Sequence, residues 1–232
     1  MRLNALTAAG LIAAVLLTPS SGPAIADDAQ KLIDDAAAMV RAMSSDSSWG
    51  HFAATYAEAR AVVLVPDFLE AGLIVGGGGG QCLILARGES DDTWSVPSFC
   101  LVVEASIGLQ IGLQKSQIMM MVMNDEALFE MLSGTAKFGG KAGLTMGMLG
   151  GGVEGATTLN ADVDIFAFSR AQGLYGGVKL DGGWIEPDAA YNRAYYGRAV
   201  TATHVVIDRR VSNPASNGLI AALAAAKGSS PQ

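Results

Sequence analysis

Glycine is concentrated in the middle of this 232-residue chain, between residues 61 and 197. That stretch holds 24 of the 29 glycines, five of them consecutive at 76–80, among runs of Val, Ile, Leu and Met. Glycine lets a strand bend and lets another backbone or a ligand come close, but it offers no nucleophile, base or metal ligand. The pattern therefore predicts a tightly packed, β-rich shell and disfavours a conventional enzyme.

The first 26 residues have the layout of a secretory signal peptide. Arg2 supplies the positive end, residues 10–17 supply an apolar core, and residues 24–26 supply the small residues of a cleavage site. The apolar core is too short for a membrane anchor, since a spanning helix needs roughly 20 apolar residues. We therefore expect export with cleavage after Ala26, and a location in the periplasm or at the outer membrane.

The charge of the chain narrows the classes of partner. The formal net charge is −7, and removing Arg2 with the leader takes it to −8. Nucleic acid and anionic lipid surfaces repel an acidic protein at long range. We expect no nucleic-acid partner, and any contact with an anionic membrane must be local or apolar.

Helical signals come first in the mature chain. Residues 27–43 place Leu32, Ala36 and Val40 on one face of a helix behind an acidic start, and residues 51–60 predict a second short helix. The polar face of the first helix is mainly acidic, whereas a helix that lies on an anionic membrane is normally basic. We expect both helices to pack on the domain.

Strand signals dominate from residue 61. Asn124 is expected to cap a helix that runs to Leu132. Met119–Met121 and Met123 are expected to fill the core, within a strand buried on both faces, rather than to form a flexible binding surface. The predicted strands are 61–65 (ended by Pro66), 71–75, 81–87, 98–103, 107–114, 117–123, 141–148, 162–168 and 174–180.

Short turns between these strands favour an antiparallel sheet, and a sheet of many strands is expected to curl so that its edges are protected. The predicted fold class is α+β: a strongly curved, glycine-rich antiparallel sheet, partly closed like a barrel, with an N-terminal helix pair and short peripheral helices. The predicted parts are a signal peptide (1–26), packed N-terminal helices (27–60), the β-rich core (61–197) and a C-terminal extension with a frayed tail helix (198–232).

Cys82 and Cys100 are the two cysteines of the chain. Both lie in apolar runs that a turn at 89–93 would fold into a hairpin, and facing residues of an antiparallel pair are close enough for a disulfide. Export would permit such a bond. The alternative is a pair of small buried core residues. Two cysteines without neighbouring histidines do not predict a metal site.

Motifs for catalysis and nucleotide binding are incomplete. The glycines at 76–80 are not followed by the Lys and Ser or Thr that a phosphate loop needs. His51 and His204 accompany no nucleophile elbow. Asp162 and Asp164 could bind calcium or simply face water, and no further carboxylates are grouped with them. We expect no enzyme activity, no cofactor, no metal and no nucleotide.

The order of several segments resembles the SYLF family, also called the Ysc84-type domain. The matching pieces are 65–66, 71–77, 94–99, 105–112, the apolar run ending at 124, 138–142, 166–178 and 192–197. The resemblance implies a lipid-binding module: eukaryotic relatives bind phosphoinositides, some bind and bundle actin, and bacterial relatives are exported stand-alone domains. This sequence departs from the eukaryotic pattern, because it shows no SH3 or FYVE domain and its leading helix is not basic. The resemblance therefore implies lipid binding without a particular head group.

Basic residues near tyrosines are the candidate lipid-binding residues. Arginine suits a lipid phosphate, and tyrosine suits the interfacial depth of a membrane. The same cations would equally suit surface ion pairs with the many Asp and Glu. The candidates are Arg193, Arg198, Tyr195, Tyr196, Arg170, Lys179, Lys137 and Lys141.

The predicted function is non-catalytic association with phospholipid or with a membrane surface of the bacterial envelope. The rival interpretation is a structural or protein-interaction scaffold of the envelope, for which the actin-binding eukaryotic relatives are the precedent. The sequence leaves the lipid head group and the oligomeric state open.

Overall fold

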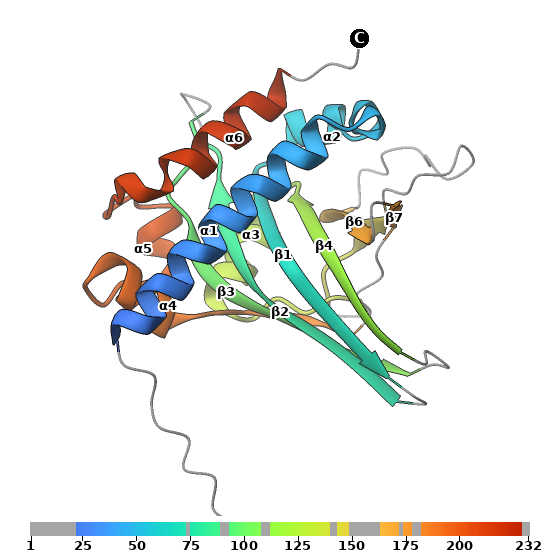
Figure 1. The fold of residues 1–232 in the computed structure, drawn as a ribbon, viewed down its shortest axis with the longest axis horizontal. Helices are drawn as coiled ribbons and strands as arrows, with labels where there is room; N and C mark the ends of the chain where they lie inside the picture. Colours follow the sequence, from blue (N-terminus) through green and yellow to red (C-terminus); the bar gives the residue numbers. More distant parts are fainter. Residues whose placement is uncertain are drawn as a thin grey trace, which may run out of the picture.

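The computed structural model describes residues 22–72, 75–88, 93–107, 112–139, 143–148, 163–171, 174–177 and 182–228. Most of the predicted signal peptide and the residues Lys141, Asp162 and Lys179 lie outside these ranges. The fold mixes helices and strands, with α1, α4 and α6 gathered on one side of a twisted sheet (Figure 1).

The helices are α1 (Gly22–Ser44), α2 (Ala53–Glu58), α3 (Asp125–Ser133), α4 (Ala189–Tyr196), α5 (Ala202–Val206) and α6 (Asn217–Lys227), with short 3-10 helices η1 (Ser47–His51) and η2 (Pro214–Ser216). The strands are β1 (Ala61–Gly72), β2 (Val75–Ala86), β3 (Ser98–Ile107), β4 (Gly112–Val122), β5 (Met146–Met148), β6 (Ile165–Ala171), β7 (Leu174–Gly177) and β8 (Trp184–Pro187).

Six strands form an antiparallel sheet in the order β6-β4-β1-β2-β3-β8. On the far edge of β6, β5 pairs in parallel and β7 pairs antiparallel, so β5 is an exception to the predicted antiparallel arrangement. Beyond β8 lie two single bridges, Lys137–Trp184 and Phe138–Leu144. The described strands do not close into a barrel, and the predicted partial closure stays a prediction.

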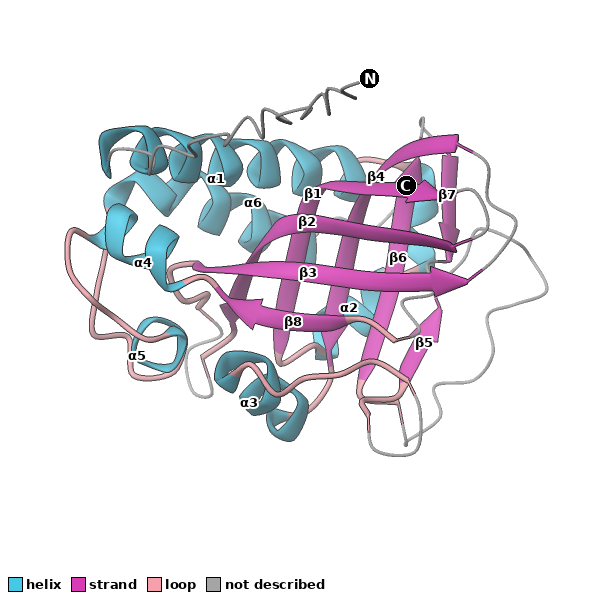
Figure 2. Cartoon of the chain, turned by 90° about the horizontal axis from the view of Figure 1, so that it is seen from below, coloured by secondary structure: helices cyan, strands magenta, loops and turns pink. Residues whose placement is uncertain are grey.

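The sheet separates two hydrophobic cores. Ile118, Met120 and Val122 of β4 point into the first core with α3 and α5, whereas Met119 and Met121 point into the second core with α1 and α6. All five side chains are fully buried, so the predicted burial of this strand on both faces is confirmed. Figure 2 shows α1 above β1, β2, β3 and β8, and α3 below them.

Helix α1 begins five residues earlier than the predicted start at Asp27 and lies across the sheet with α6 beside it (Figure 1). None of the described helices combines the length and apolar character required to traverse a bilayer. Two buried hydrogen bonds fasten α6: the Trp49 Nε1–H donates to the Ala226 carbonyl at 3.2 Å, and the Tyr56 hydroxyl donates to the Leu223 carbonyl at 2.6 Å. The alanine-rich tail helix is therefore a packed part of the second core.

The prediction that Pro66 ends the first strand is wrong, because β1 continues through it to Gly72. The register shifts at this point, between Val65 and Phe68 against β4 and between Leu64 and Leu69 against β2. A β-bulge leaves a residue outside the regular ladder, which is where a strand tolerates a proline that has no N–H to donate.

The prediction of one continuous strand over 107–114 is also wrong. Ile107 ends β3 and Gly112 begins β4, and these strands are not neighbours because β2 and β1 lie between them. The residues between them lie outside the described ranges. Alternation of apolar and small residues specifies the two faces of a strand, but it does not specify where a strand ends.

Helix α3 confirms its sequence signal. The Asn124 side chain accepts a hydrogen bond from the Ala127 N–H at 2.8 Å, which is the expected N-cap. The helix ends at Gly134, whose φ of 74° lies in the left-handed region that glycine adopts readily.

Candidate functional site

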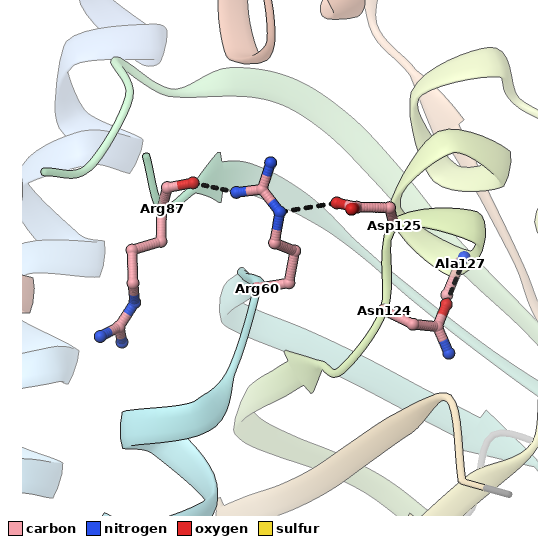
Figure 3. A network of polar contacts seen from close by, with 5 residues as sticks. All are labelled: Arg60, Arg87, Asn124, Asp125 and Ala127. Atoms are coloured by element: carbon pink, nitrogen blue, oxygen red, sulfur yellow. Dashed lines mark hydrogen bonds and ion pairs between the residues drawn. The ribbon is translucent and has the colours of Figure 1, made fainter. Parts of the chain in front are cut away.

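A polar network joins the ends of β1 and β2 to the start of α3 (Figure 3). The Arg60 guanidinium donates to the Asp125 carboxylate at 2.6 Å and to the Arg87 carbonyl oxygen. The Arg87 guanidinium donates to the Tyr56 carbonyl at 2.9 Å and lies over the Trp94 ring. The sequence reasoning missed this network, although each arginine directly borders a predicted strand. The polar groups of this network hydrogen-bond to one another, so we assign it a role in holding β1, β2 and α3 together.

A second network fastens α4 to β3 through Asn192, which is 1% exposed. The side-chain oxygen of Asn192 accepts from the Phe99 N–H at 3.1 Å, and its amide donates to the Asp188 carbonyl at 3.0 Å. The Asp188 carboxylate in turn accepts from the N–H groups of Ala190 and Tyr191 and so caps α4. The segment 192–197, one piece of the family resemblance, therefore holds a helix on the sheet.

We expect the Asn192→Ala substitution to lower the free energy of unfolding by about 2 kcal/mol, because the Phe99 N–H is left buried without its acceptor. Urea denaturation followed by circular dichroism measures the loss. Arg193→Ala, at the exposed neighbour on the same helix, is the matched control and should change the free energy by less than about 0.5 kcal/mol. Equal losses for the two variants would contradict this role of Asn192.

The predicted tyrosine pair points inward. Tyr195 is 9% exposed with its ring 5.2 Å from that of Phe99, and the Tyr196 hydroxyl donates to the Pro97 carbonyl at 2.6 Å. Burial raises the pKa of Tyr195 to about 12 and raises the pKa of Tyr196 still further. Arg193 and Arg198 are exposed. The predicted combination of arginine and tyrosine on one lipid-facing surface is therefore not formed.

The other candidate cations lie on different elements. Arg170 is on β6, opposite Gln117 of β4, and is partly buried. Lys137 is exposed and forms a β-bridge with Trp184, the first residue of β8. Lys141 and Lys179 lie outside the described ranges. Lys137 and Arg170 both face the helix side of the sheet, near opposite ends of the strand order.

The structure gives Asp164 a structural role. The Asp164 carboxylate accepts from the Asn124 amide and from the Thr145 N–H, both at 2.8 Å. His204 lies 3.9 Å from the Asp208 carboxylate at a half-exposed position. Within the described part of the chain, no group of three or more His, Cys, Asp or Glu side chains could hold a metal ion.

A part of the sheet that the described helices do not cover carries exposed apolar side chains. The far ends of β1, β2 and β4 reach beyond α1 and α6 (Figure 1). On the helix side of this region, Leu69 is 48%, Leu101 36% and Trp184 40% exposed. We call this surface the open sheet face and define it by Leu69, Leu101, Val103, Trp184, Gly77, Gly79, Lys115 and Lys137.

The side of the sheet that each residue faces follows from the register. Trp184 pairs with Val103, Val103 with Gly79, and Gly79 with Leu69. Directly paired residues share one face of a sheet, and so do alternate residues of one strand. Gly79 lies two positions from Gln81 and four from Leu83, which belongs to the second core, so the row faces the helix side.

The glycines of β2 divide by face. Gly78 and Gly80 face the first core, and a Cβ on Gly78 would lie 2.7 Å from the Phe68 ring. Gly77 and Gly79 face the helix side, where a Cβ would meet one backbone oxygen of β3, at 3.0 and 3.2 Å respectively. The Phe68 ring at Gly78 and the Asp67 carbonyl oxygen at Gly80 leave no room for a side chain, whereas the open sheet face has a bare floor at Gly77 and Gly79.

Comparison with known proteins gives the family. A profile of the Ysc84 family, described as "Las17-binding protein actin regulator", matches residues 103–226. The chain belongs to the Ysc84 family. The Ysc84 match runs from β3 through α6 and includes Trp184, whereas Leu69 and the glycines of β2 precede it.

The relatives that this chain matches are longer proteins. The chain is 30% identical over 158 residues to "LAS seventeen-binding protein 3" of Saccharomyces cerevisiae, which covers 67% of this chain and 34% of that protein. It is 27% identical over 143 residues to "SH3 domain-containing YSC84-like protein 1" of Rattus norvegicus, which covers 61% of this chain and 42% of that protein. The Ysc84 region therefore spans about a third to two fifths of these relatives.

Proposed function

We propose that the chain is a non-catalytic lipid-binding module that associates with a membrane surface of the bacterial envelope. The open sheet face carries this proposal. Exposed Leu69, Leu101 and Trp184 share one face of a sheet, and a contiguous exposed apolar patch on a soluble domain is typical of an interaction surface. Tryptophan in particular suits the interfacial depth of a membrane.

We further propose export to an oxidising compartment, with the leader removed after Ala26. Cys82 and Cys100 form a disulfide across β2 and β3, as predicted. This bond supports the proposed location, because disulfides persist mainly outside the reducing cytosol. Cleavage after Ala26 would shorten α1 by residues 22–26. The buried stripe of α1 begins at Ala29, so the contacts of the helix with the sheet and with α6 would be retained.

Vesicle flotation tests the proposed lipid binding. We expect the chain that begins at Asp27 to float both with vesicles of phosphatidylglycerol and phosphatidylethanolamine and with neutral phosphatidylcholine vesicles, because apolar contact carries the proposed binding. High salt should not abolish flotation, since salt screens both the long-range repulsion between the acidic chain and anionic lipid and the local attraction of exposed lysines, and leaves apolar contact intact. A gradient without vesicles is the control. Failure to float with any composition at either salt concentration would remove the proposal.

The second candidate function is a protein-interaction module, which the family description as an actin regulator favours. Co-sedimentation with actin filaments tests it. Filament binding by the mature chain, combined with no vesicle binding, would replace the lipid proposal with this one.

A further inference from the structure

We propose that the open sheet face seats one aliphatic chain whose anionic head group lies at Lys137, so that the ligand is a fatty acid or a comparable single-chain anionic amphiphile. This inference rests on the proposed lipid-binding function and assigns it a site and a ligand class. Three observations carry it: the row of cross-strand partners, its charge, and its length.

The row crosses six segments in register. Lys137 bridges to Trp184, and the row continues through Val103 and Gly79 to Leu69 and Lys115. Its middle is apolar, with Leu69 and Trp184 exposed on either side of the bare floor at Gly79. A flexible hydrocarbon chain can therefore lie against Gly79 and contact the flanking Val103 and Leu69. The row is too uneven for a flat protein surface to contact Gly79 and its flanking side chains together.

Within the row, the charge fits an anion at the end next to Trp184, while Glu186, on the same face two residues along β8, opposes Leu101 and lies outside the row. Lys137 is exposed and directly neighbours Trp184, whereas Lys115 at the opposite end forms an ion pair with Asp67 at 2.6 Å. The chain as a whole carries a formal charge of −7, so a row that begins and ends with lysine differs from the average surface. An ammonium beside an indole suits a carboxylate or phosphate head group above an apolar tail.

The length of the row also fits. Neighbouring strands lie about 4.8 Å apart, so the three steps from Trp184 to Leu69 span about 14 Å. The hydrocarbon core of a bilayer is about 30 Å thick, so the tail of one leaflet extends about 15 Å. One membrane acyl chain therefore matches the apolar part of the row.

Quenching of tryptophan emission by dibromostearate tests the site directly. Trp49 and Trp94 are 2% and 6% exposed, so Trp184, at 40%, is the tryptophan that a chain in this row would contact. We expect saturable quenching of the wild-type protein with one molecule bound. The Trp184→Phe variant should lose the quenched component, while unbrominated stearate should compete with the probe.

Two variants locate the ligand. Leu69→Glu places a carboxylate on the apolar floor at a 48% exposed position, and Lys137→Glu reverses the charge at the head-group end. Each should weaken dibromostearate binding about tenfold or more, the effect of losing about 1.4 kcal/mol of binding free energy. Phe129→Glu is the matched control, because Phe129 is 63% exposed on α3, on the other side of the sheet. The affinity of this variant for dibromostearate should equal that of the wild type. Circular dichroism melting of each variant verifies the fold.

The outcomes separate the site from the general function. Unchanged quenching in both Leu69→Glu and Lys137→Glu overturns the site, and continued vesicle flotation would then leave the proposed function standing. Absence of quenching together with absence of flotation overturns both. Light scattering gives a third outcome. If the wild type is a dimer, Leu69→Glu dissociates it and no fatty acid binds, this face binds a second copy of the chain and the proposed site is overturned.

Discussion

The Gly80→Ala substitution is expected to lower the free energy of unfolding by about 3 kcal/mol, the upper part of the range for overpacking a close contact. A Cβ built on Gly80 would clash with the Asp67 carbonyl oxygen and would lie 3.0 Å from the Val65 Cγ1. The Asp67 oxygen belongs to the bulge in β1, so neither strand can retreat without disturbing the register on both sides. Urea denaturation of the two proteins measures the difference.

Gly79→Ala is the matched control in the same run of glycines. Its Cβ would face the open sheet face and meet one atom, the Val102 carbonyl oxygen, at 3.2 Å. We expect the free energy of unfolding to change by less than about 1 kcal/mol. The cost of the close contact is partly offset because alanine restricts the unfolded chain more than glycine does. Equal losses at positions 79 and 80 would show that the close approach to the bulge does not explain Gly80.

Loss of the Cys82–Cys100 disulfide is expected to cost a comparable amount, about 3 kcal/mol. The two cysteines are paired across β2 and β3, 18 residues apart in sequence, and both are fully buried. The bond restricts the unfolded chain, so its removal favours unfolding even where the folded strands stay paired. Urea denaturation with and without dithiothreitol measures the difference in the free energy of unfolding. Because the bond is buried, the reductant is added at urea concentrations that unfold the protein and expose the bond.

The double variant Cys82→Ala/Cys100→Ala is the control for reductant. It should be less stable than the oxidised wild type, and dithiothreitol should not change its denaturation midpoint. A wild-type midpoint that does not respond to reduction of the bond would contradict the expected stabilisation.

The local elements of the fold were readable from the chain. The apolar run at 117–123, the cap at Asn124 and the face-to-face placement of Cys82 and Cys100 all appear where the patterns put them. Each depends on short-range rules: strand alternation, a side-chain acceptor at a helix start, and hairpin pairing across a turn. The errors at Pro66 and at 107–114 concern strand ends, which depend on partners distant in sequence.

The candidate site was harder to predict, and the tyrosines show why. Tyr195 and Tyr196 beside Arg193 look like an interfacial group, yet α4 turns both rings toward Phe99 and Pro97. Leu69 and Trp184, by contrast, have no motif around them. They lie on strands 115 residues apart in sequence and become neighbours in one row through β2 and β3.

The chain alone was enough to assign the mixed helix and strand class, the family, the core strand at 117–123 and the facing cysteines, because these depend on residue periodicity and on segments close in sequence. The order of the strands, the bulge at Pro66, the inward turn of the tyrosines and the uncovered apolar row all needed the folded arrangement. Burial is a property of what packs against a side chain, and for these residues the packing partner comes from a remote part of the chain.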